Sequence, residues 1–470
     1  MSRLAELDKK YVWHPFTQMQ DWVRSESIVI TSGSGATLRD ERGREYLDAN
    51  SSIWTNLHGH NHIEINRAIQ AQLKKIAHSS ALGLANEPAS LLAEKLVVLA
   101  KPKPTRARNV NPPGMDKVFF SDDGSTAMEV ALKLGYEFTR RTERSKRPRF
   151  LSLAGAYHGD TIGAVSLGHI DRFHRAYSGM LFKTDTAASP YCYRCPFNRA
   201  RPERADAREY RKCDWECLGV LDKKFELRKK RSDPYAAFVF EPQMQGAAGM
   251  IAQPKGWLGE ATKMARNHGA LLIADEVMTG FGRTGAGNQL LACQTERVQP
   301  DLAALAKGLT GGYLPMGATL TTSEIYNAFL GRYDEFKTFF HGHSYTANQL
   351  GASAALASLG LLTDEKSRQA RARLESGMRA QLQLLWNLPQ VGDIRQVGLI
   401  AGIELVKDWR TREAYDLKEQ AGIRVCNGMA KRGVLTRPIG NVIVLMPPYC
   451  TTSDQLARMT TAMREAIAEL

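Results

Sequence analysis

The sequence has no long hydrophobic run. None of its apolar stretches approaches the ~18 uninterrupted residues that a membrane-spanning helix requires. Residues 1–10 are polar and lack the hydrophobic segment of a secretion signal. Internal repeats and low-complexity tracts are also absent. From these absences we expect a soluble, cytoplasmic protein that does not bind membranes.

Cysteine is scarce, because seven cysteines in 470 residues are too few for a disulfide scaffold. Four of them form a CxxC…CxxxC set in an arginine-rich insertion, residues 188–217: Cys192, Cys195, Cys213 and Cys217. Four thiolates at this spacing could hold a structural zinc ion, and a reduced, thiol-bearing loop is the alternative. Since 17 residues separate the two pairs and the other motifs need no metal, we predict no metal site.

Negative charge is in the minority, with 49 Asp and Glu against 63 Lys and Arg, a formal net charge of +14. The basic residues are dispersed, no basic stripe alternates with aromatic residues, and no nucleic-acid-binding motif is present. We therefore expect no DNA or RNA partner. Excess positive charge can attract phosphorylated or carboxylated small molecules, and a solvated basic surface without function is the simpler alternative.

What the sequence does contain is a series of short apolar runs separated by helix-like segments. The runs are 117–120, 149–154, 236–240, 270–274 and 302–306, and each ends in polar or glycine-rich residues. Such alternation is typical of parallel strands covered by helices on both faces. In these sheets, ligands bind at the carboxyl ends of the strands. The sequence therefore predicts an α/β fold with a large, doubly wound, mainly parallel sheet and a site at its polar strand ends.

We divide the chain into three parts. Residues 1–70 are predicted to form an irregular segment with a hairpin, residues 71–345 the large domain, and residues 346–470 a smaller α+β domain. The last part combines long helical stretches, glycine-punctuated strands and a final amphipathic helix at 453–469. We expect residues 1–70 to pack with the small domain.

Four strand ends carry chemically useful groups. Gly124 and Ser125 open a helix, where free backbone N–H groups can bind a phosphate. Tyr157 could stack on a planar ring, and Asp275 follows a run that we take as buried, so it needs a donor or cation as partner. Burial at a strand end would lower the pKa of Lys307 and make its amine nucleophilic. Singly these are ordinary cap, packing and surface residues, but together they meet the needs of pyridoxal phosphate.

The motif DEVMTGFGRTG at 275–285, followed by Lys307, resembles class III (ω-amino-acid) aminotransferases of PLP fold type I. The resemblance runs from about residue 10 to the C-terminus. Further segments resemble the branch of this family that aminates 8-amino-7-oxononanoate to 7,8-diaminononanoate in biotin biosynthesis. They are HPFTQM at 14–19, SSIW at 51–54, HGHNH at 58–62, KGLTGGYLP at 307–315, HGHSYT at 341–346 and TRPIG at 436–440.

The resemblance implies roles for the matching residues. Lys307 would hold the cofactor aldehyde as a Schiff base, Asp275 would pair with the pyridine nitrogen, and Tyr157 would stack on the ring. The cofactor would also be bound by Gly124, Ser125, His343 and Ser344: Gly124 and Ser125 would hold its phosphate, and Ser344 would reach the phosphate from a neighbouring subunit. The active site would thus be shared within a homodimer. The substrate side, for a small-molecule amino donor and a keto acid, would be lined by Phe16, Trp54, Asp160, Gly342 and Arg437.

Two positions bear on the amino donor. Members of the branch that use S-adenosylmethionine typically carry tyrosine where this chain has Phe16, and often a second tryptophan where it has Ile53. These two residues would make the wall of the substrate pocket smaller and less polar. This favours lysine over S-adenosylmethionine as the amino donor but does not decide between them.

Two other functions stay open. One is a different class III ω-aminotransferase, acting on β-alanine, taurine or a diamine with pyruvate. The other is a non-catalytic relative that binds pyridoxal phosphate, which the joint presence of Lys307, Asp275 and Tyr157 disfavours.

Overall fold

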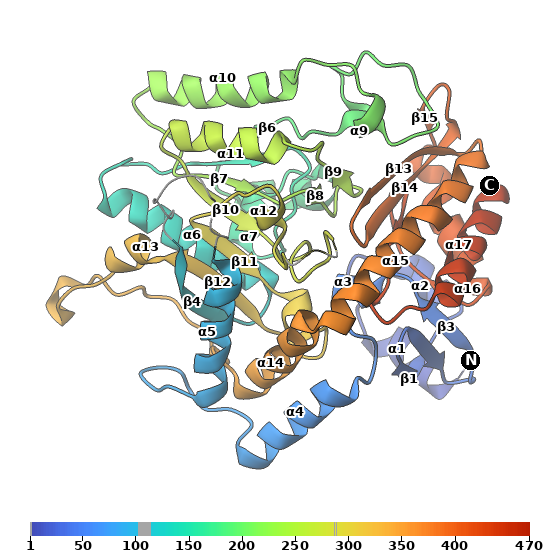
Figure 1. Cartoon of the computed structure of the whole chain (residues 1–470), viewed down its shortest axis with the longest axis horizontal. Coiled ribbons are helices and arrows are strands. Elements are labelled where there is room, and N and C mark those ends of the chain that lie inside the picture. Colours follow the sequence, from blue (N-terminus) through green and yellow to red (C-terminus); the bar gives the residue numbers. More distant parts are fainter. Residues whose placement is uncertain (1, 102–113, 286, 288) are drawn as a thin grey trace.

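A seven-stranded sheet forms the centre of the computed structural model, which describes residues 2–101, 114–285, 287 and 289–470 (Figure 1). Its order is β4-β12-β11-β10-β7-β5-β6. The strands are β4 (Met115–Ser121), β5 (Phe150–Leu153), β6 (Asp185–Ala187), β7 (Ala237–Phe240), β10 (Leu271–Asp275), β11 (Leu302–Leu305) and β12 (Gly317–Thr322). The five predicted runs are β4, β5, β7, β10 and β11, so the prediction of a large α/β sheet is confirmed.

One strand, β12, departs from the parallel pattern because it is antiparallel to both neighbours, β11 and β4. Two reversals restore the common direction, so β4 still runs parallel to β11, β10, β7 and β5. The carboxyl ends of all five predicted strands therefore lie at one edge of the sheet. That edge is where the site residues gather.

Helices cover both faces of the sheet. The side chains of β10 alternate between two hydrophobic cores: Leu272 and Ala274 belong to the core that includes residues of α5 (Glu87–Ala100) and α11 (Trp257–Asn267), whereas Leu271 and Ile273 belong to the core that includes residues of α6 (Gly124–Arg141). This is why the strand reads as an unbroken apolar run. Asp123 caps α6 in a capping box with Thr126, which places the start of the helix directly after β4.

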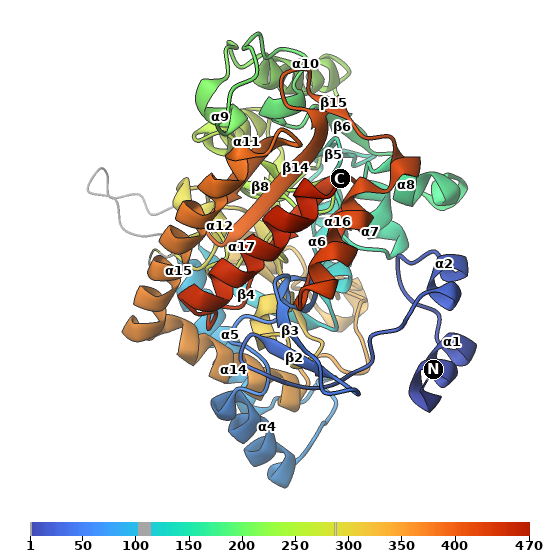
Figure 2. The ribbon, with the colours of Figure 1, turned by 90° about the vertical axis from the view of Figure 1, so that its right-hand side faces the viewer.

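The C-terminal part contains a second sheet, of order β13-β14-β18-β17 with β15 beside β14. Long helices, α15 and α17 among them, lie along it (Figures 1 and 2). The elements are α14 (Gln349–Thr363), α15 (Glu365–Gln383), α16 (Ala421–Lys431), α17 (Ser453–Ala468), β13 (Val391–Val397), β14 (Ile400–Asp408), β15 (Glu413–Ala414), β17 (Pro438–Ile439) and β18 (Val442–Leu445).

The N-terminal hairpin shares a sheet with the C-terminal part. Its strands are β1 (Ile30–Ser34), β2 (Thr37–Asp40) and β3 (Glu45–Asp48), and β3 pairs in parallel with β16 (Val434–Leu435). The helices of this region are α1 (Arg3–Tyr11), α2 (Met19–Arg24) and α4 (Ile63–Lys75), and α4 packs against α14. The boundary at residue 70 falls inside α4, and the domain division stays a prediction.

The remaining elements of the described chain are α10 and a set of shorter helices and strands. They are α3 (Ser51–Trp54), α7 (Ile162–Leu167), α8 (Asp171–His174), α9 (Ala207–Tyr210), α10 (Glu216–Lys230), α12 (Ala292–Thr295), α13 (Ser323–Asn327), β8 (Met244–Gln245), β9 (Ile251–Ala252), and the 3₁₀ helices η1 (Arg175–Met180), η2 (Cys192–Arg194), η3 (Lys307–Thr310), η4 (Tyr333–Glu335), η5 (Leu384–Asn387) and η6 (Leu417–Glu419). No helix in the described ranges is both long and apolar enough to span a bilayer.

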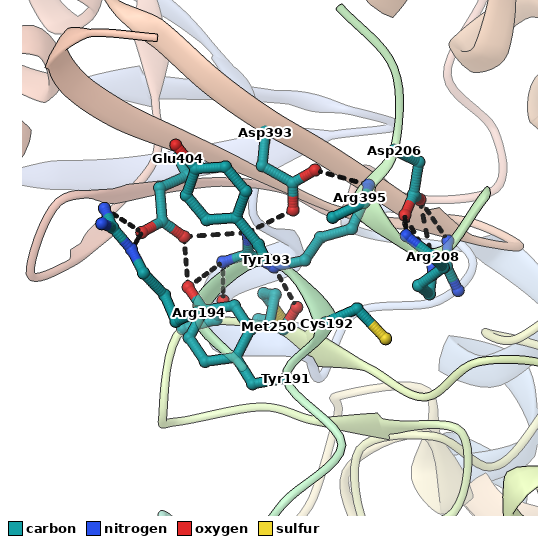
Figure 3. Close-up of polar contacts among 12 residues, drawn as sticks. Tyr191, Cys192, Tyr193, Arg194, Asp206, Arg208, Met250, Asp393, Arg395 and Glu404 are labelled. Atoms are coloured by element: carbon teal, nitrogen blue, oxygen red, sulfur yellow. Dashed lines mark hydrogen bonds and ion pairs between the residues drawn. The ribbon is translucent and has the colours of Figure 1, made fainter. Parts of the chain in front are cut away.

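The insertion 188–217 docks on the small sheet through buried charges (Figure 3). Arg395 of β13 forms ion pairs with Asp393 and with Glu404 of β14, each at 2.9 Å. From the insertion, Arg194 Nη2 lies 3.0 Å from Glu404 Oε1, and the Tyr191 hydroxyl donates to the same carboxylate. The insertion is therefore anchored by complementary charge as well as by packing.

Candidate active site

A cavity of about 560 Å³ lies where the strand ends of the large sheet meet the loop after β11. This volume is typical of a site for a small molecule or cofactor. Seven of the residues predicted from the sequence line it: Trp54, Gly124, Ser125, Tyr157, Asp160, Asp275 and Lys307. Five of them, Gly124, Ser125, Tyr157, Asp275 and Lys307, follow from the strand-end argument, and Trp54 and Asp160 from the family resemblance.

Lys307 begins η3, directly after β11, with a left-handed backbone (φ 45°). Burial lowers the pKa of its amine, and the carboxylates of Asp275 and Glu241 only partly oppose this effect. The Nζ atom lies 5.0 Å from the centroid of the Trp54 ring. A lysine with a lowered pKa can be neutral near physiological pH, so it can act as a nucleophile or take up a proton.

Asp275 ends β10 and is 5% exposed. Its Oδ1 accepts a hydrogen bond from the Val277 N–H at 3.0 Å, and its Oδ2 lies 2.7 Å from Nδ1 of His158. Burial alone would lower the pKa of His158, but the bond to Asp275 carries it above the ordinary value. Two donors thus satisfy this buried carboxylate and fix its orientation toward the cavity.

Glu241 follows β7 and was not among the predicted site residues. Its carboxyl accepts hydrogen bonds from the backbone N–H groups of Gly246 (2.8 Å) and Tyr157 (3.4 Å). Burial raises the pKa of this carboxyl to about 7. Like His158, Glu241 lies at the end of a predicted strand, so the rule that selected Asp275 would also have found these two residues.

The start of α6 forms one corner of the cavity. Ser125 Oγ accepts from the Thr161 N–H and donates to Thr161 Oγ1, both at 3.0 Å. Gly159 makes this approach possible, because a Cβ there would lie 2.2 Å from Ser125 Oγ. Helix N–H groups together with a serine suit a phosphate.

Tyr157 forms one wall of the cavity. Its hydroxyl donates to Asp160 Oδ2 at 2.7 Å, which fixes the ring within the lining. The ring lies within 6.4 Å, centroid to centroid, of the rings of Phe16, Phe173 and His174.

The groups of this cavity fit pyridoxal 5′-phosphate. An amine, a carboxylate held by two donors, an aromatic wall and a helix N-terminus line one space, and they match the aldehyde, the pyridine nitrogen, the ring and the phosphate in turn.

Trp54 enters the cavity from a left-handed turn, α3. Four consecutive non-glycine residues have positive φ: Ser51 (46°), Ser52 (47°), Ile53 (62°) and Trp54 (69°). Each costs about 1–2 kcal/mol relative to a right-handed backbone. Strain of this kind persists only where surrounding contacts determine it, and it is common at functional sites.

Two predicted residues lie next to the cavity rather than in its described lining. The Phe16 ring contacts that of Tyr157 edge-on, with centroids 6.4 Å apart, and also packs on Phe173. Arg437 Nη2 donates to the Phe16 carbonyl at 3.0 Å. Phe16 and Arg437 therefore form one group on the Tyr157 side of the site.

The segment 342–344 does not reach the described lining within one chain. His343 Nδ1 lies 3.1 Å from Asp122 Oδ2, and the Ser344 carbonyl accepts from His78 Nε2 at 2.9 Å. The roles of Gly342, His343 and Ser344 stay predictions, because they depend on a second subunit.

The four cysteines of the insertion meet at one small cavity of about 10 Å³, with Cys192 and Cys217 buried. However, no three of their sulfur atoms lie within 4.8 Å of one another in the described part of the chain. Thiolates that share a zinc ion at ~2.3 Å must lie about 3.8 Å apart. Whether these thiols bind a zinc ion or stay a reduced loop is not decided by this geometry, and the absence of a metal site stays a prediction.

With this fold and this site, the chain belongs to the class III aminotransferases: the family model "Aminotransferase class-III" matches residues 19–467. It is therefore an aminotransferase of a family that depends on pyridoxal 5′-phosphate. A protein of Geobacter sulfurreducens named adenosylmethionine-8-amino-7-oxononanoate aminotransferase is 44% identical over 464 residues, which cover 99% of this chain and 97% of that protein.

Two solved structures have the same fold. The adenosylmethionine-8-amino-7-oxononanoate aminotransferase of Methanocaldococcus jannaschii superposes with a TM-score of 0.88 at 40% identity, covering 99% of this chain and 98% of the other. An amine transaminase from an uncultivated Pseudomonas species, in its PLP-bound form, gives 0.86 at 31% identity and covers 98% of each chain. The predicted fold type and cofactor class are thereby confirmed.

Proposed function

We propose that this aminotransferase converts 8-amino-7-oxononanoate to 7,8-diaminononanoate in biotin biosynthesis. The observation that carries the proposal is the cavity in which Lys307, Asp275 and Tyr157 meet beside Trp54 and, through Phe16, Arg437. Phe16, Trp54, Lys307 and Arg437 lie in the segments through which the sequence resembles the biotin branch. The names of relatives at 37–45% identity support the same substrate.

We assign the following roles to the residues of the cavity. Lys307 would carry the cofactor, Asp275 would face its ring nitrogen, and the start of α6 with Ser125 would hold its phosphate. When bound, the cofactor supplies an electron sink that lets an amino group pass from donor to acceptor. Lys307, with its lowered pKa, would then take and return the proton at the carbon that carries the nitrogen.

Arg437 is proposed to bind the carboxylate of the keto acid. Its guanidinium contacts the Phe16 carbonyl at the Tyr157 side of the site, and a planar fork matches a carboxylate. Replacing Arg437 by glutamine should raise KM for the keto acid about tenfold or more, since a charged hydrogen bond contributes about 1.5–3 kcal/mol. The half-reaction with the amino donor should change less if the donor does not use this arginine.

The amino donor is the second part of the proposal. Phe16 has no hydroxyl group. Ile53, which is 46% exposed, stands where members of the branch that use S-adenosylmethionine often carry a second tryptophan. These two residues favour lysine, whereas the names of the relatives contain adenosylmethionine. We propose that lysine is the amino donor. A screen that compares the formation of 7,8-diaminononanoate with lysine and with S-adenosylmethionine tests this part of the proposal. Product formed only with S-adenosylmethionine would refute this part and leave the keto acid assignment intact.

The site is proposed to be completed by a second copy of the chain. The described lining contains one lysine and no arginine, so a phosphate would rely on α6, Ser125 and the partner's segment 342–344. Large apolar side chains beside that segment are exposed, including Phe336 (70%), Phe340 (72%) and Tyr345 (62%). Clustered exposed apolar groups of this kind mark surfaces that another protein covers. A monomer that binds the cofactor with full affinity would contradict a shared site.

Parallel half-reactions test the substrate. Enzyme loaded with an amino group is mixed with 8-amino-7-oxononanoate or, as the control, with pyruvate. Discharge by 8-amino-7-oxononanoate is the expected result. Discharge by pyruvate alone would identify a different class III ω-aminotransferase, and discharge by neither, with no response to any amine, would indicate a non-catalytic relative.

A further inference from the structure

A buried carboxylate, that of Asp48, the last residue of β3, bonds the left-handed turn 51–54. Asp48 is 2% exposed. Its Oδ1 accepts from the Ser52 N–H at 3.0 Å and from the Asn50 N–H at 3.2 Å, and its Oδ2 accepts from Ser52 Oγ at 2.9 Å. Two of these three donors belong to a residue with a strained backbone, Ser52 (φ 47°).

The same carboxylate also connects to the chain that follows the turn. His60 Nε2 lies 3.0 Å from Asp48 Oδ2, and Asn56 Nδ2 lies 2.9 Å from His60 Nδ1. Asn56 Oδ1 in turn accepts from the Gly59 N–H at 2.9 Å. Asp48 therefore fixes both the start of the turn and the segment that leaves it.

The turn is in contact with the loop that carries Lys307. A Cβ on Gly312, five residues after Lys307, would lie 2.8 Å from the Asn56 backbone nitrogen, so the two segments pack closely. Trp54, the last residue of the turn, faces the Lys307 amine with its ring. A shift of the turn would thus move the aromatic surface against which that amine lies.

The sequence of the turn is informative because glycine would adopt a positive φ without strain. The chain instead keeps Ser-Ser-Ile-Trp here, with Trp54 in the cavity and Ile53 exposed beside it. Side chains retained despite backbone strain indicate that their placement matters for the site.

We propose that Asp48 is a positioning residue for amino transfer: it holds the left-handed turn 51–54 so that Trp54 stays against Lys307. This inference deepens the proposed function, since it concerns the same cavity. It does not depend on which keto acid or donor the enzyme uses.

Asp48→Asn tests the inference, with Asp40→Asn as the matched control. Asp40 is 3% exposed, lies in the same hairpin, and also accepts several hydrogen bonds, from Arg42, Arg44 and Tyr46, but it does not contact the turn 51–54. We expect kcat to fall about tenfold or more in Asp48→Asn, equivalent to ~1.4 kcal/mol, at equal folded content. Asp40→Asn should retain the activity of the wild type per folded molecule. Equal losses in both variants would overturn the proposal.

Tryptophan fluorescence of the cofactor-free protein supplies a readout that needs no turnover. The contribution of Trp54 is the difference between each chain and its Trp54→Phe version. We expect acrylamide to quench this contribution more strongly in Asp48→Asn than in wild type or Asp40→Asn. An unchanged Trp54 signal would overturn the proposal even if activity fell, and a changed signal would support it even if the substrate assignment failed.

A double-mutant cycle completes the test. If Asp48 acts through Trp54, the activity losses of Asp48→Asn and Trp54→Phe will not be additive, because Trp54→Phe removes the indole ring that Asp48→Asn would displace. Additive losses would refute the connection. If Asp48→Asn fails to fold, Ser52→Ala takes its place in the cycle, because it removes a single hydrogen bond to Asp48. Non-additive losses with Trp54→Phe would again support the proposal, and additive losses would refute it.

Discussion

Replacing Arg395 by methionine should destabilise the protein strongly, because this guanidinium lies at the centre of the contact between the insertion and the small sheet (Figure 3). Arg395 is 2% exposed and forms ion pairs with Asp393 and Glu404, both at 2.9 Å. Its Nε also donates to the Met250 carbonyl at 2.6 Å and its Nη2 to the Gly249 carbonyl at 2.5 Å. Methionine matches the stem of arginine and offers none of these donors.

The expected cost follows from what the substitution leaves behind. Removing one partner of a buried ion pair costs about 3–5 kcal/mol, since the remaining charge is buried without compensation. Two unpaired carbonyl groups add about 1 kcal/mol each. Relief comes from Asp393, whose pKa is already raised by burial, so it can take up a proton. Glu404 loses the charge that lowers its pKa most but retains Arg194 and Tyr191 as partners. We therefore expect a loss of about 5 kcal/mol.

Urea unfolding followed by fluorescence measures this loss, with Arg199→Met as the control. Arg199 belongs to the same insertion and also pairs with two carboxylates, but its side chain is 57% exposed and that of its partner Asp214 is 89% exposed. An exposed pair contributes at most about 1 kcal/mol. If Arg395→Met proved no more destabilising than Arg199→Met, the reasoning from burial would be refuted.

Three further predictions concern the site. Lys307→Ala should fold but lose both the visible absorbance of bound cofactor and amino transfer, and a variant that still cycles would exclude Lys307 as the reactive amine. His158→Phe removes a charge-assisted donor from Asp275, so the dissociation constant of the cofactor should rise about tenfold or more by equilibrium dialysis; an unchanged constant would show that Asp275 does not depend on His158. Burial raises the pKa of Glu241 from 4.5 to about 7, so the folded chain keeps a proton that the unfolded chain releases, and stability should fall by about 3 kcal/mol as pH rises across this interval. Glu241→Gln in the cofactor-free protein should remove that fall in urea titrations between about pH 5 and about pH 8, and an identical pH slope in both chains would contradict the assignment.

The large sheet was predictable because its strands are buried on both faces. Runs such as 270–274, which alternate with helix-like segments, are typical of covered parallel strands, and their polar ends marked the site edge. Strand β12 was missed for a physical reason. It follows β11 with only the short 3₁₀ helix η3 between them, and it reads Gly-Ala-Thr-Leu-Thr-Thr, a sequence with little apolar character although every residue is buried.

The left-handed turn 51–54 could not have been anticipated. Ser, Ile and Trp carry no preference for positive φ, and nothing local distinguishes this segment from an ordinary loop. Its conformation is set by Asp48 and by the Met446 carbonyl, which accepts from Ser51 Oγ at 2.7 Å from 395 positions away. Likewise, the sequence indicates that Arg395, Asp393 and Glu404 are charged, but only the fold shows that their charges meet inside the protein.

Arg395 and Lys307 are both enclosed basic residues, but they differ in whether a carboxylate pairs with them. This difference distinguishes a structural charge from a reactive one. Arg395 has carboxylates at 2.9 Å on two sides, and these neighbours raise its pKa, so it stays charged and immobile. Lys307 makes no ion pair or hydrogen bond with any residue that the structure describes, and burial lowers its pKa. An enclosed amine that is left unpaired is unfavourable for stability alone, because the same volume filled by leucine or methionine would avoid the desolvation cost. Its retention in a cavity lined by Asp275 and Tyr157 is therefore explained by reactivity, and Lys307→Met should stabilise the cofactor-free fold even as it abolishes amino transfer.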